Sequence, residues 1–390
     1  MFACVLGFSC ENEILLYHFI QRWRCYSFFL QDRQRFLDVS KFTVDVASAV
    51  RRAECKMYAV RYIPQAPGDL DAQVPPELTI IIVNWNGGEL IRNCLKSISM
   101  APPSVPYEIV VVDNASSDDS VAWLRSEAVT ALMPGITVHV IENSENEGFS
   151  KANNQAIAYS KAPMVFLLNP DTEVTSGAID ALIACLNSNE RIGACGPRLL
   201  NTDGSLQPSV YRNPPPPWVT IVTGTGLWRL VPRRVRGDLL LGGHWDHATR
   251  RTVPLIFGAA FIAKRAMIED VGGLDERFHM YAEDDEWCLR IARAGWQLVF
   301  EPSAIVTHHA GQLANQRWSS SEKLRVRMNA GFQYNRYCLS RRGRIASVFA
   351  SCVVALTQKS YYRLRGHPME VAQLKWDLNI EELKRSLSGN

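Results

Sequence analysis

The sequence predicts an α/β fold in which a mostly parallel sheet is flanked by helices. Short runs of β-branched and other apolar residues recur from Leu78 onward, as expected for strands that are buried on both faces. Segments with helical spacing separate these runs, and polar loops follow them. Because strands that alternate with helices form parallel sheets covered by helices, residues 78–187 are predicted to hold four such strand and helix pairs.

The first two pairs follow from continuous apolar runs. Leu78–Trp85 (LTIIIVNW) is one such run, and two glycines end it before Glu89–Ser99, which has helical spacing. Glu108–Asp113 (EIVVVD) is the second run. A turn with helix-capping residues leads from it into Ser120–Glu127, where a second helix is predicted.

Two further pairs complete the predicted sheet. Ile136–Ile141 is a strand followed by the helix Phe149–Ser160, and Met164–Leu168 (MVFLL) is a strand followed by the helix Ser176–Asn187. Right-handed crossovers place the loop after each strand at the carboxyl edge of the sheet, where ligands bind. These loops are polar, as a nucleotide site requires: Asn84–Gly88, Asp113–Asp119, Glu142–Phe149 and Asn169–Thr172.

The chain beyond residue 200 is predicted to be less regular. Leu255–Ala263 is an apolar run, and Asp284–Ala294 has the pattern of a short amphipathic helix. Trp296–Phe300 is a predicted strand, and Ile305–His309 leads into a pair of histidines. After Trp318 the chain is helical and basic.

Three regions are predicted along the chain. Residues 1–76 form an N-terminal extension and linker, residues 77–315 form the α/β domain, and residues 316–390 form a basic helical C-terminal region. The extension is rich in aromatic residues and cysteine without a helix or strand period, and prolines punctuate its end. It is an additional N-terminal element or, as we favour, a poorly packed extension or the product of an upstream start codon, with the native start near Met57.

Composition and charge narrow the class of protein. Hydrophobic residues make up 47% and charged residues 21%, which is typical of a folded protein, and a net charge of +3 is too small to indicate a nucleic-acid partner. The ten cysteines show no paired pattern, which in 390 residues predicts reduced thiols in a cytosolic setting. No apolar run reaches the about 20 residues that a spanning helix needs, and the signal-peptide pattern is missing. We expect a cytoplasmic protein, with or without peripheral contact to a membrane face.

Polar residues at two of the predicted loops are candidates for binding a nucleotide. Asp113 follows a buried strand, where a carboxylate can accept a hydrogen bond from a base or a ribose hydroxyl, while helix capping explains the serines after it. Asn146, Gly148 and Asn153 surround a predicted helix start, a position that favours phosphate. Taken alone, this second group is explained more simply as a glycine turn with polar helix residues.

Two acidic groups are candidates for the chemistry. Asp171, in Asn169-Pro-Asp at the end of the fourth strand, is placed to bind Mg²⁺ or Mn²⁺ on a diphosphate, and one of the two histidines at 308–309 could complete that site. Asn-Pro-Asp is also a common turn sequence. Four consecutive acids, residues 283–286, open a predicted helix. Acids at the start of a helix interact favourably with the positive end of its dipole. Their mutual repulsion also raises a carboxylate pKa, as a general base requires.

Taken together, these residues resemble the family 2 glycosyltransferases with the GT-A fold, in particular their bacterial rhamnosyltransferase-like branch. The resemblance runs from about Leu78 to Gln312 and depends on the order and spacing of seven motifs. These motifs are VNWNG (Val83–Gly87), VVDNASSD (Val111–Asp118), NEGFSKANN (Asn146–Asn154), LLNPDTEV (Leu167–Val174), GAAFIAKR (Gly258–Arg265), GGLDERFHMYAEDDEWCLR (Gly272–Arg290) and THHAG (Thr307–Gly311).

The resemblance implies an inverting transfer of a sugar from a nucleotide-diphosphate sugar. A rhamnose-like deoxyhexose is the first choice for this sugar. The acceptor would be a hydroxyl of a glycan or lipid-linked saccharide in cell-surface polysaccharide synthesis. Asp284 would be the catalytic base, supported by Glu283. Asp171 and His308 would hold a divalent metal, Mg²⁺ or Mn²⁺. The residues expected to bind the nucleotide-sugar are Asn84, Asp113, Asn146, Gly148, Asn153, Asn169 and Asp171.

Two positions depart from the family pattern. Asn169 stands where many members have the first of two metal-binding aspartates, and Glu286 stands where the acidic motif usually ends in aspartate. Two other functions were weighed. A sugar-nucleotide pyrophosphorylase would need a basic phosphate loop after the first strand, and Asn84–Glu89 has no basic residue. A non-catalytic sugar-nucleotide-binding homologue is disfavoured by the retained acids Asp171 and Asp284.

Basic residues gather in two places outside these motifs. Arg229, Arg233, Arg234 and Arg236 lie in one short loop, and a second cluster spans residues 317–344 before the apolar segment Ile345–Thr357. These segments either dock on anionic lipid near a lipid-diphosphate acceptor or form a solvated basic face and a core helix. The sequence favours neither alternative.

Overall fold

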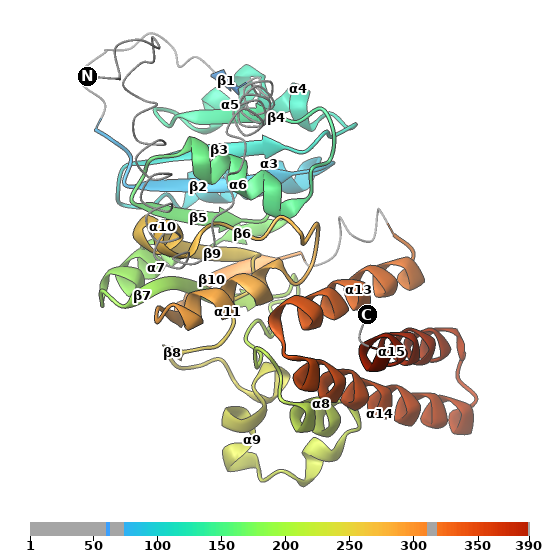
Figure 1. The fold of residues 1–390 in the computed structure, drawn as a ribbon. Helices are drawn as coiled ribbons and strands as arrows, with labels where there is room; N and C mark the ends of the chain where they lie inside the picture. The colour runs from blue at the N-terminus through green and yellow to red at the C-terminus, as the bar shows by residue number, and fades with distance from the viewer. Residues whose placement is uncertain (1–59, 63–73, 310–317, 389–390) are drawn as a thin grey trace, which may run out of the picture. The chain divides into compact units, whose positions relative to one another are not determined.

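The computed structural model of the chain describes residues 60–62, 74–309 and 318–388; the predictions for residues 1–59, and those for Gly311, Gln312 and Arg317, lie outside these ranges. Within them the strands form one ten-stranded sheet in the order β1-β4-β3-β2-β5-β9-β7-β10-β6, with β8 paired to β10 (Figure 1). The strands are β1 (Val60–Tyr62), β2 (Leu78–Asn84), β3 (Tyr107–Asp113), β4 (Val138–Glu142), β5 (Met164–Leu168), β6 (Thr172–Val174), β7 (Ile192–Leu200), β8 (Arg251–Thr252), β9 (Ala260–Lys264) and β10 (Gln297–His308).

The four strands predicted for the first half form the parallel part of the sheet. β2 pairs in parallel with β3 and β5, and β3 pairs in parallel with β4. Beyond them the sheet gains antiparallel partners, since β9 lies antiparallel between β5 and β7 and β6 lies antiparallel to β10. β1, which lies within the predicted N-terminal extension, pairs antiparallel with β4. The parallel part aligns the carboxyl ends of β2, β3, β4 and β5 at one edge.

Helices cover the sheet and continue beyond it at the C-terminus. The helices, including the 3₁₀ turns η2 and η3, are α3 (Glu89–Met100), α4 (Ser120–Leu124), α5 (Glu127–Leu132), α6 (Phe149–Tyr159), α7 (Ala178–Asn187), α8 (Pro217–Gly224), η2 (Leu227–Leu230), α9 (Arg233–Leu240), η3 (Gly242–His244), α10 (Arg265–Val271), α11 (Glu283–Arg293), α13 (Ser320–Cys338), α14 (Arg341–Arg365) and α15 (Glu370–Ser388).

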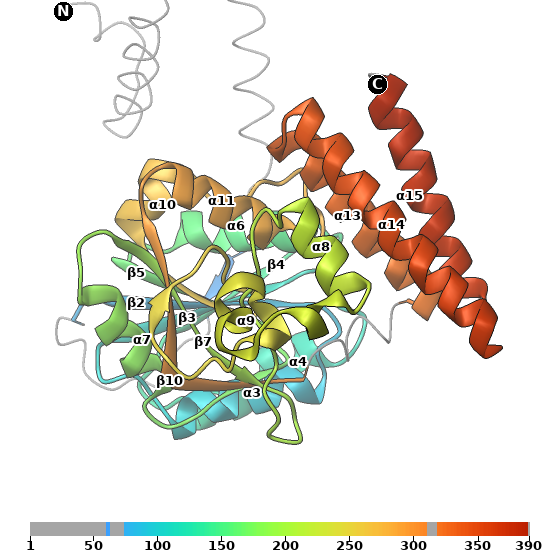
Figure 2. The same ribbon diagram turned by 90° about the horizontal axis from the view of Figure 1, so that it is seen from below.

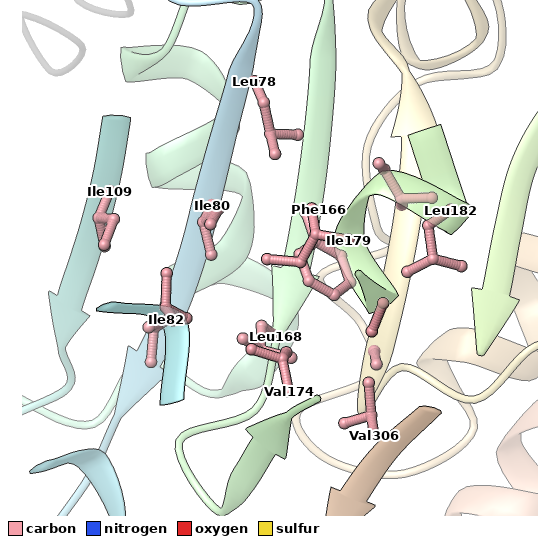
Figure 3. Close-up of a cluster of buried hydrophobic side chains, with 14 of the residues drawn as sticks. Leu78, Ile80, Ile82, Ile109, Phe166, Leu168, Val174, Ile179, Leu182 and Val306 are labelled. Carbon is pink, nitrogen blue, oxygen red and sulfur yellow. The ribbon is translucent and has the colours of Figure 1, made fainter. Parts of the chain in front are cut away.

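Two hydrophobic clusters lie on the two faces of the sheet, because alternate side chains of each strand point in opposite directions. Ile80 and Ile82 of β2 pack with α3 and α7 residues such as Leu182 on one face (Figure 3). Ile81 packs with residues of α6, α10 and α11 on the other face. All seven residues of β2 are buried, which explains its uninterrupted apolar sequence.

The structure differs from the predicted elements in three places. The predicted helix Ser120–Glu127 is two helices, because Ser126 has an extended backbone that ends one and begins the next. The segments 296–300 and 305–309 belong to one strand, β10, with an irregular register between Glu301 and Ile305. β7 was not predicted because Gly193, Gly196 and Pro197 interrupt its apolar pattern. A Cβ on Gly196 would clash with Ile256, so close packing requires this glycine.

The C-terminal helices pack on each other and on the region around the acidic helix α11. α14 contacts α15 and α8, and α13 contacts α11 (Figure 2). An ion pair between Arg336 of α13 and the buried Glu382 joins α13 to α15. Tyr334 of α13 also packs with Phe278 and Ala282, just before α11. No helix within the described ranges is long and apolar enough to cross a membrane.

Candidate active site

A cleft of about 210 Å³ opens at the carboxyl edge of the parallel strands. The loops after β2, β3, β4 and β5 line it, together with residues 279–281 and the end of β10. Five predicted site residues line this cleft: Asn146, Gly148, Asn169, Asp171 and His308. The structure therefore brings together loops from positions far apart in the sequence, as the crossover argument predicted.

Asn84 and Asp113 lie beneath the cleft and do not line it. Both are buried, with exposed fractions of 0% and 2%. The Asn84 Nδ2 donates to Asp113 Oδ1 at 2.9 Å, and the backbone N–H and hydroxyl of Ser116 donate to the same carboxylate. In this structure Asp113 therefore holds the loop after β3 in place, and its neighbour Asn114 is the residue that lines the cleft.

Gly148 lies at the start of α6, but the loop before α11 covers this helix start. Gly148 has φ 86° and ψ 167°. A Cβ at this position would lie 2.9 Å from the carbonyl oxygen of His279 and would also clash with its ring. The Phe149 N–H donates to the same carbonyl at 2.9 Å. The glycine thus admits His279, and the first N–H group of the helix is not open to a phosphate as the sequence suggested.

Asn153 also differs from its predicted role. Its side chain is buried, with an exposed fraction of 1%, and its Nδ2 donates to the carbonyl oxygen of Phe149 one turn earlier in α6. It does not line the cleft. Its polar character is explained by this hydrogen bond within the helix, a local use that sequence spacing cannot distinguish from ligand binding.

Asp171 and His308, 137 residues apart in the sequence, meet at the cleft because β6 pairs with β10. The His308 Nε2 lies 3.4 Å from Asp171 Oδ1, and Asp171 is only 6% exposed. Gln207 determines which ring nitrogen carries the hydrogen. Its Nε2 donates to Asn201, so its Oε1 accepts a 2.7 Å hydrogen bond from Nδ1 of His308. The Nε2 lone pair then faces the carboxylate, an arrangement suited to sharing a cation.

Asn169 adds a third donor atom to this pair. It lines the cleft beside Asp171, and its Oδ1 is buried without a hydrogen-bond partner among the described residues. Within the same ranges, no group of three or more His, Cys, Asp or Glu side chains is arranged to hold a metal ion. A carboxylate, an imidazole nitrogen and an amide oxygen nevertheless fit Mg²⁺ or Mn²⁺, which take further ligands from phosphates and water.

The acidic run begins α11 and lies next to the cleft. Asp284 is half-buried, and its carboxylate accepts hydrogen bonds from the Gly258 N–H at 3.0 Å and the Asp285 N–H at 2.9 Å. A Cβ on Gly258 would lie 3.6 Å from Asp284 Cβ and 3.7 Å from the ring of Phe149, a residue that lines the cleft. Burial raises the pKa of Asp284 although these hydrogen bonds oppose the rise.

The neighbouring acids of this run are also poorly solvated. Burial and the charge of Asp284 raise the pKa of Glu283 well above its ordinary value, and Glu283 Oε2 is buried without a hydrogen-bond partner in the described part of the chain. The same two causes raise the pKa of Asp285 to about 7. Because the carboxylates of residues 283–285 are close together, ionisation of one opposes ionisation of its neighbours.

The backbone before α11 is strained. Tyr281 and Ala282 have φ of 69° and 67°, a left-handed conformation that non-glycine residues rarely adopt. Such positions cluster at functional sites because surrounding structure must hold them. Here the turn places Tyr281 in the cleft and the acids behind it. The motif around residues 279–282 was recognised in the sequence, but its cleft-lining role was not; no local signal separates Tyr281 or His279 from ordinary loop residues.

The chain is similar to known proteins in sequence. Residues 79–253 match glycosyl transferase family 2. An N-acetylglucosaminyl-diphospho-decaprenol L-rhamnosyltransferase of Mycobacterium tuberculosis is 28% identical over 258 residues, which is 60% of this chain and 76% of that protein. A low-salt glycan biosynthesis hexosyltransferase of Haloferax volcanii is 29% identical over 221 residues, covering 56% of this chain and 62% of its own.

Solved structures include a mannosyltransferase from Pyrobaculum calidifontis in complex with GDP-Man and Mn²⁺. It aligns with a TM-score of 0.45 and 16% identity, covering 87% of this chain and 94% of that one.

Proposed function

We propose that the chain is a glycosyltransferase with the GT-A fold, which its match to glycosyl transferase family 2 over residues 79–253 supports, and that it inverts the configuration of the sugar it transfers. The proposed donor is a nucleotide-diphosphate deoxyhexose, with dTDP-rhamnose first. The proposed acceptor is a hydroxyl of a glycan or lipid-linked saccharide in cell-surface polysaccharide synthesis. The rhamnosyltransferase similarity supports this sugar and this class of acceptor.

The observation that carries the proposal is the position of Asp284 beside the cleft. Its carboxylate accepts a hydrogen bond from Gly258, which lies beside the ring of the cleft residue Phe149, and burial raises its pKa toward the range in which a general base works best. In the proposed step, the acceptor oxygen bonds to the anomeric carbon and the bond from this carbon to the diphosphate oxygen breaks. The diphosphate leaves with the electron pair, and Asp284 takes the proton of the hydroxyl. A single displacement of this kind needs no covalent intermediate.

Asp171, His308 and Asn169 would hold a divalent metal. When bound, the metal would neutralise the charge that develops on the leaving diphosphate. Gln207 orients His308 so that Nε2 faces the site. Asn114 and Asn146, which are hydrogen-bonded to each other at 3.1 Å, line the part of the cleft that would receive the nucleotide.

The proposal is tested with dTDP-rhamnose, UDP-N-acetylglucosamine and GDP-mannose, each with and without Mn²⁺. A true donor raises the unfolding temperature through mass action, and we expect dTDP-rhamnose with Mn²⁺ to give the largest rise. Proton NMR of the transferred sugar then gives its anomeric configuration. A product that keeps the configuration of the donor would contradict the inverting mechanism, and stabilisation by another nucleotide-sugar alone would contradict the choice of rhamnose.

The proposed location is the cytoplasmic face of a membrane, with peripheral contact through η2 and α9. Leu227 and Leu230 are 47% and 80% exposed there, and Arg229, Arg233 and Arg234 are exposed beside them. Apolar side chains flanked by arginines bind anionic lipid surfaces. We expect the chain to float with phosphatidylglycerol vesicles and not with phosphatidylcholine vesicles. The double variant Leu230→Ser and Arg233→Gln should not float with these vesicles. If it floats as the wild type does, this surface is not the membrane contact.

A further inference from the structure

A second cavity lies between the C-terminal helices and the acidic helix. Its volume is about 840 Å³, against about 210 Å³ for the cleft. One face of α13 lines it, with residues 324, 327, 328 and 331 at helical spacing, and α8 and α14 form its other walls. Apolar side chains in these walls include Val219, Phe332 and Val354, and polar side chains such as those of Thr220, Ser351 and Gln358 line the same walls. We call this cavity the helical chamber.

The helical chamber and the cleft come together at α11. Asp284 lies against Gly258 on the cleft side, whereas the next residue, Asp285, lines the helical chamber. Asn213 fixes this point, since its Nδ2 donates to the Asp285 carbonyl at 2.6 Å and its Oδ1 accepts from Tyr334 at 2.7 Å. A molecule in the helical chamber therefore has one end beside the acidic run.

Arg327 of α13 lies at the same junction. Its side chain lines the helical chamber, and its guanidinium lies 5.7 Å from the ring centre of Tyr281, which lines the cleft. The structure gives Arg327 no acidic partner within salt-bridge distance in the described ranges, and the residue is exposed. Arg212 and Lys375 also line the helical chamber, and Asp285 is its only acid among the described residues. The charges therefore favour an anionic ligand. The apolar side chains of the walls would contact an apolar part of that ligand.

The outer surface of the two wall helices supports a lipid as that ligand. Trp218 of α8 is 49% exposed, and Phe349 and Leu356 of α14 are 57% and 50% exposed. Large exposed apolar side chains on both walls indicate a surface that meets apolar material. A membrane that contacts these side chains would lie against the helices that wall the helical chamber.

We propose that the helical chamber binds the acceptor, taking the isoprenoid chain of a lipid diphosphate between α8, α13 and α14 and its phosphate on Arg327. Asp285 positions the acceptor sugar so that its hydroxyl reaches Asp284. This inference rests on the proposed function, since it assigns the acceptor of that reaction to a place separate from the donor cleft.

Binding of farnesyl diphosphate to the full chain tests the inference, measured by calorimetry with and without saturating dTDP. We expect binding that dTDP does not displace, and weaker binding of inorganic diphosphate and of farnesol. Arg327→Gln should weaken farnesyl diphosphate roughly tenfold by removing a charge-assisted contact. Arg325→Gln, on the same helix and exposed but outside the helical chamber, is the matched control and should bind as the wild type does.

Gly331→Leu tests the apolar part separately. Gly331 lines the helical chamber, and a Cβ there meets no atom within 4 Å, so a leucine fills the space without a backbone clash. We expect farnesyl diphosphate binding to be lost while the unfolding temperature does not fall. Wild-type affinity in both variants, or displacement of farnesyl diphosphate by dTDP, would overturn the inference. These binding results do not depend on turnover, so a failure of donor transfer would contradict the proposed function separately.

Discussion

The cleft and the helical chamber are built in different ways. Short loops at the edge of a parallel sheet form the cleft, and hydrogen bonds such as those of Asp113 with Asn84 and Ser116 hold these loops in place. Helices from distant parts of the chain form the helical chamber, and the acid that faces it, Asp285, has a raised pKa. The difference indicates that the backbone shapes the proposed donor site, whereas side chains would determine what the proposed acceptor site admits. The chemistry is expected at the boundary between them.

The largest effect is expected from Asp284, at the boundary between the cleft and the helical chamber. Asp284→Asn removes the proposed base and keeps an amide oxygen for the Gly258 N–H, while its NH2 group replaces the oxygen that accepts from the Asp285 N–H. We expect kcat to fall by about 10³-fold or more, since general base catalysis contributes that much. Calorimetry should show donor affinity within about threefold of the wild type, because the residue does not line the cleft. Activity near the wild-type level would remove Asp284 from the chemistry.

The next effect tests how strictly the backbone fixes the donor side. Gly148→Ala places a Cβ against the His279 carbonyl and ring in a conformation that alanine rarely adopts. We expect a loss of about 2–3 kcal/mol in the free energy of unfolding, with weaker donor binding because His279 moves. Gly272→Ala is the matched control. Its φ and ψ of 87° and 164° are nearly the same, but its Cβ meets only the end of Arg290 at 3.4 Å.

Both variants should lose stability from backbone strain, and only Gly148→Ala should raise the KM for the donor. Equal effects on donor KM would mean that the contact with His279 has no influence on the cleft.

Much of the sheet could be predicted because its local sequence carries enough information. Met164–Leu168 is a strand with the predicted bounds, since five consecutive buried positions leave an uninterrupted apolar run. β7 was missed because its glycines serve contacts with Ile256 and Trp296, which no local pattern reveals. The site residues also divide into those that local sequence predicts and those that only the fold reveals. Asp171 and His308 were expected from their motifs, whereas Gln207 is 101 residues from His308 and only the fold brings them together.

A smaller effect is expected from this long-range partner. Gln207→Leu removes the acceptor that fixes His308, so the ring loses its preferred tautomer and orientation. We expect the Mn²⁺ concentration for half-maximal activity to rise about 10-fold to 100-fold. Glu173→Gln is the matched control, because Glu173 pairs with the adjacent His309, which does not line the cleft. A similar change in both variants would indicate a general disturbance at the end of β10.

The smallest expected effect tests whether the helical chamber is shielded from water. The pKa of Asp285 is raised from 3.8 to about 7 by burial and by the charge of Asp284. Because the folded chain then holds a proton that the unfolded chain releases near pH 4, stability is highest at low pH. It falls as the pH rises toward 7, where the folded group also ionises. Asp285→Asn removes this loss. We expect the free energy of unfolding to increase on the order of 1 kcal/mol at pH 8 and to change less at pH 5.

Asp203→Asn provides a control of opposite sign for that last measurement. Hydrogen bonds from the hydroxyl and N–H of Ser205 lower the pKa of Asp203 from 3.8, so its stabilising effect is present at both pH 5 and pH 8, and Asp203→Asn should lose the same free energy of unfolding at both. Denaturant unfolding at pH 5 and pH 8 measures both variants. If Asp285→Asn gives no gain at pH 8, its carboxylate is solvated in the folded chain. The helical chamber would then be open to water at α11, and an apolar acceptor chain could not be held there as we propose.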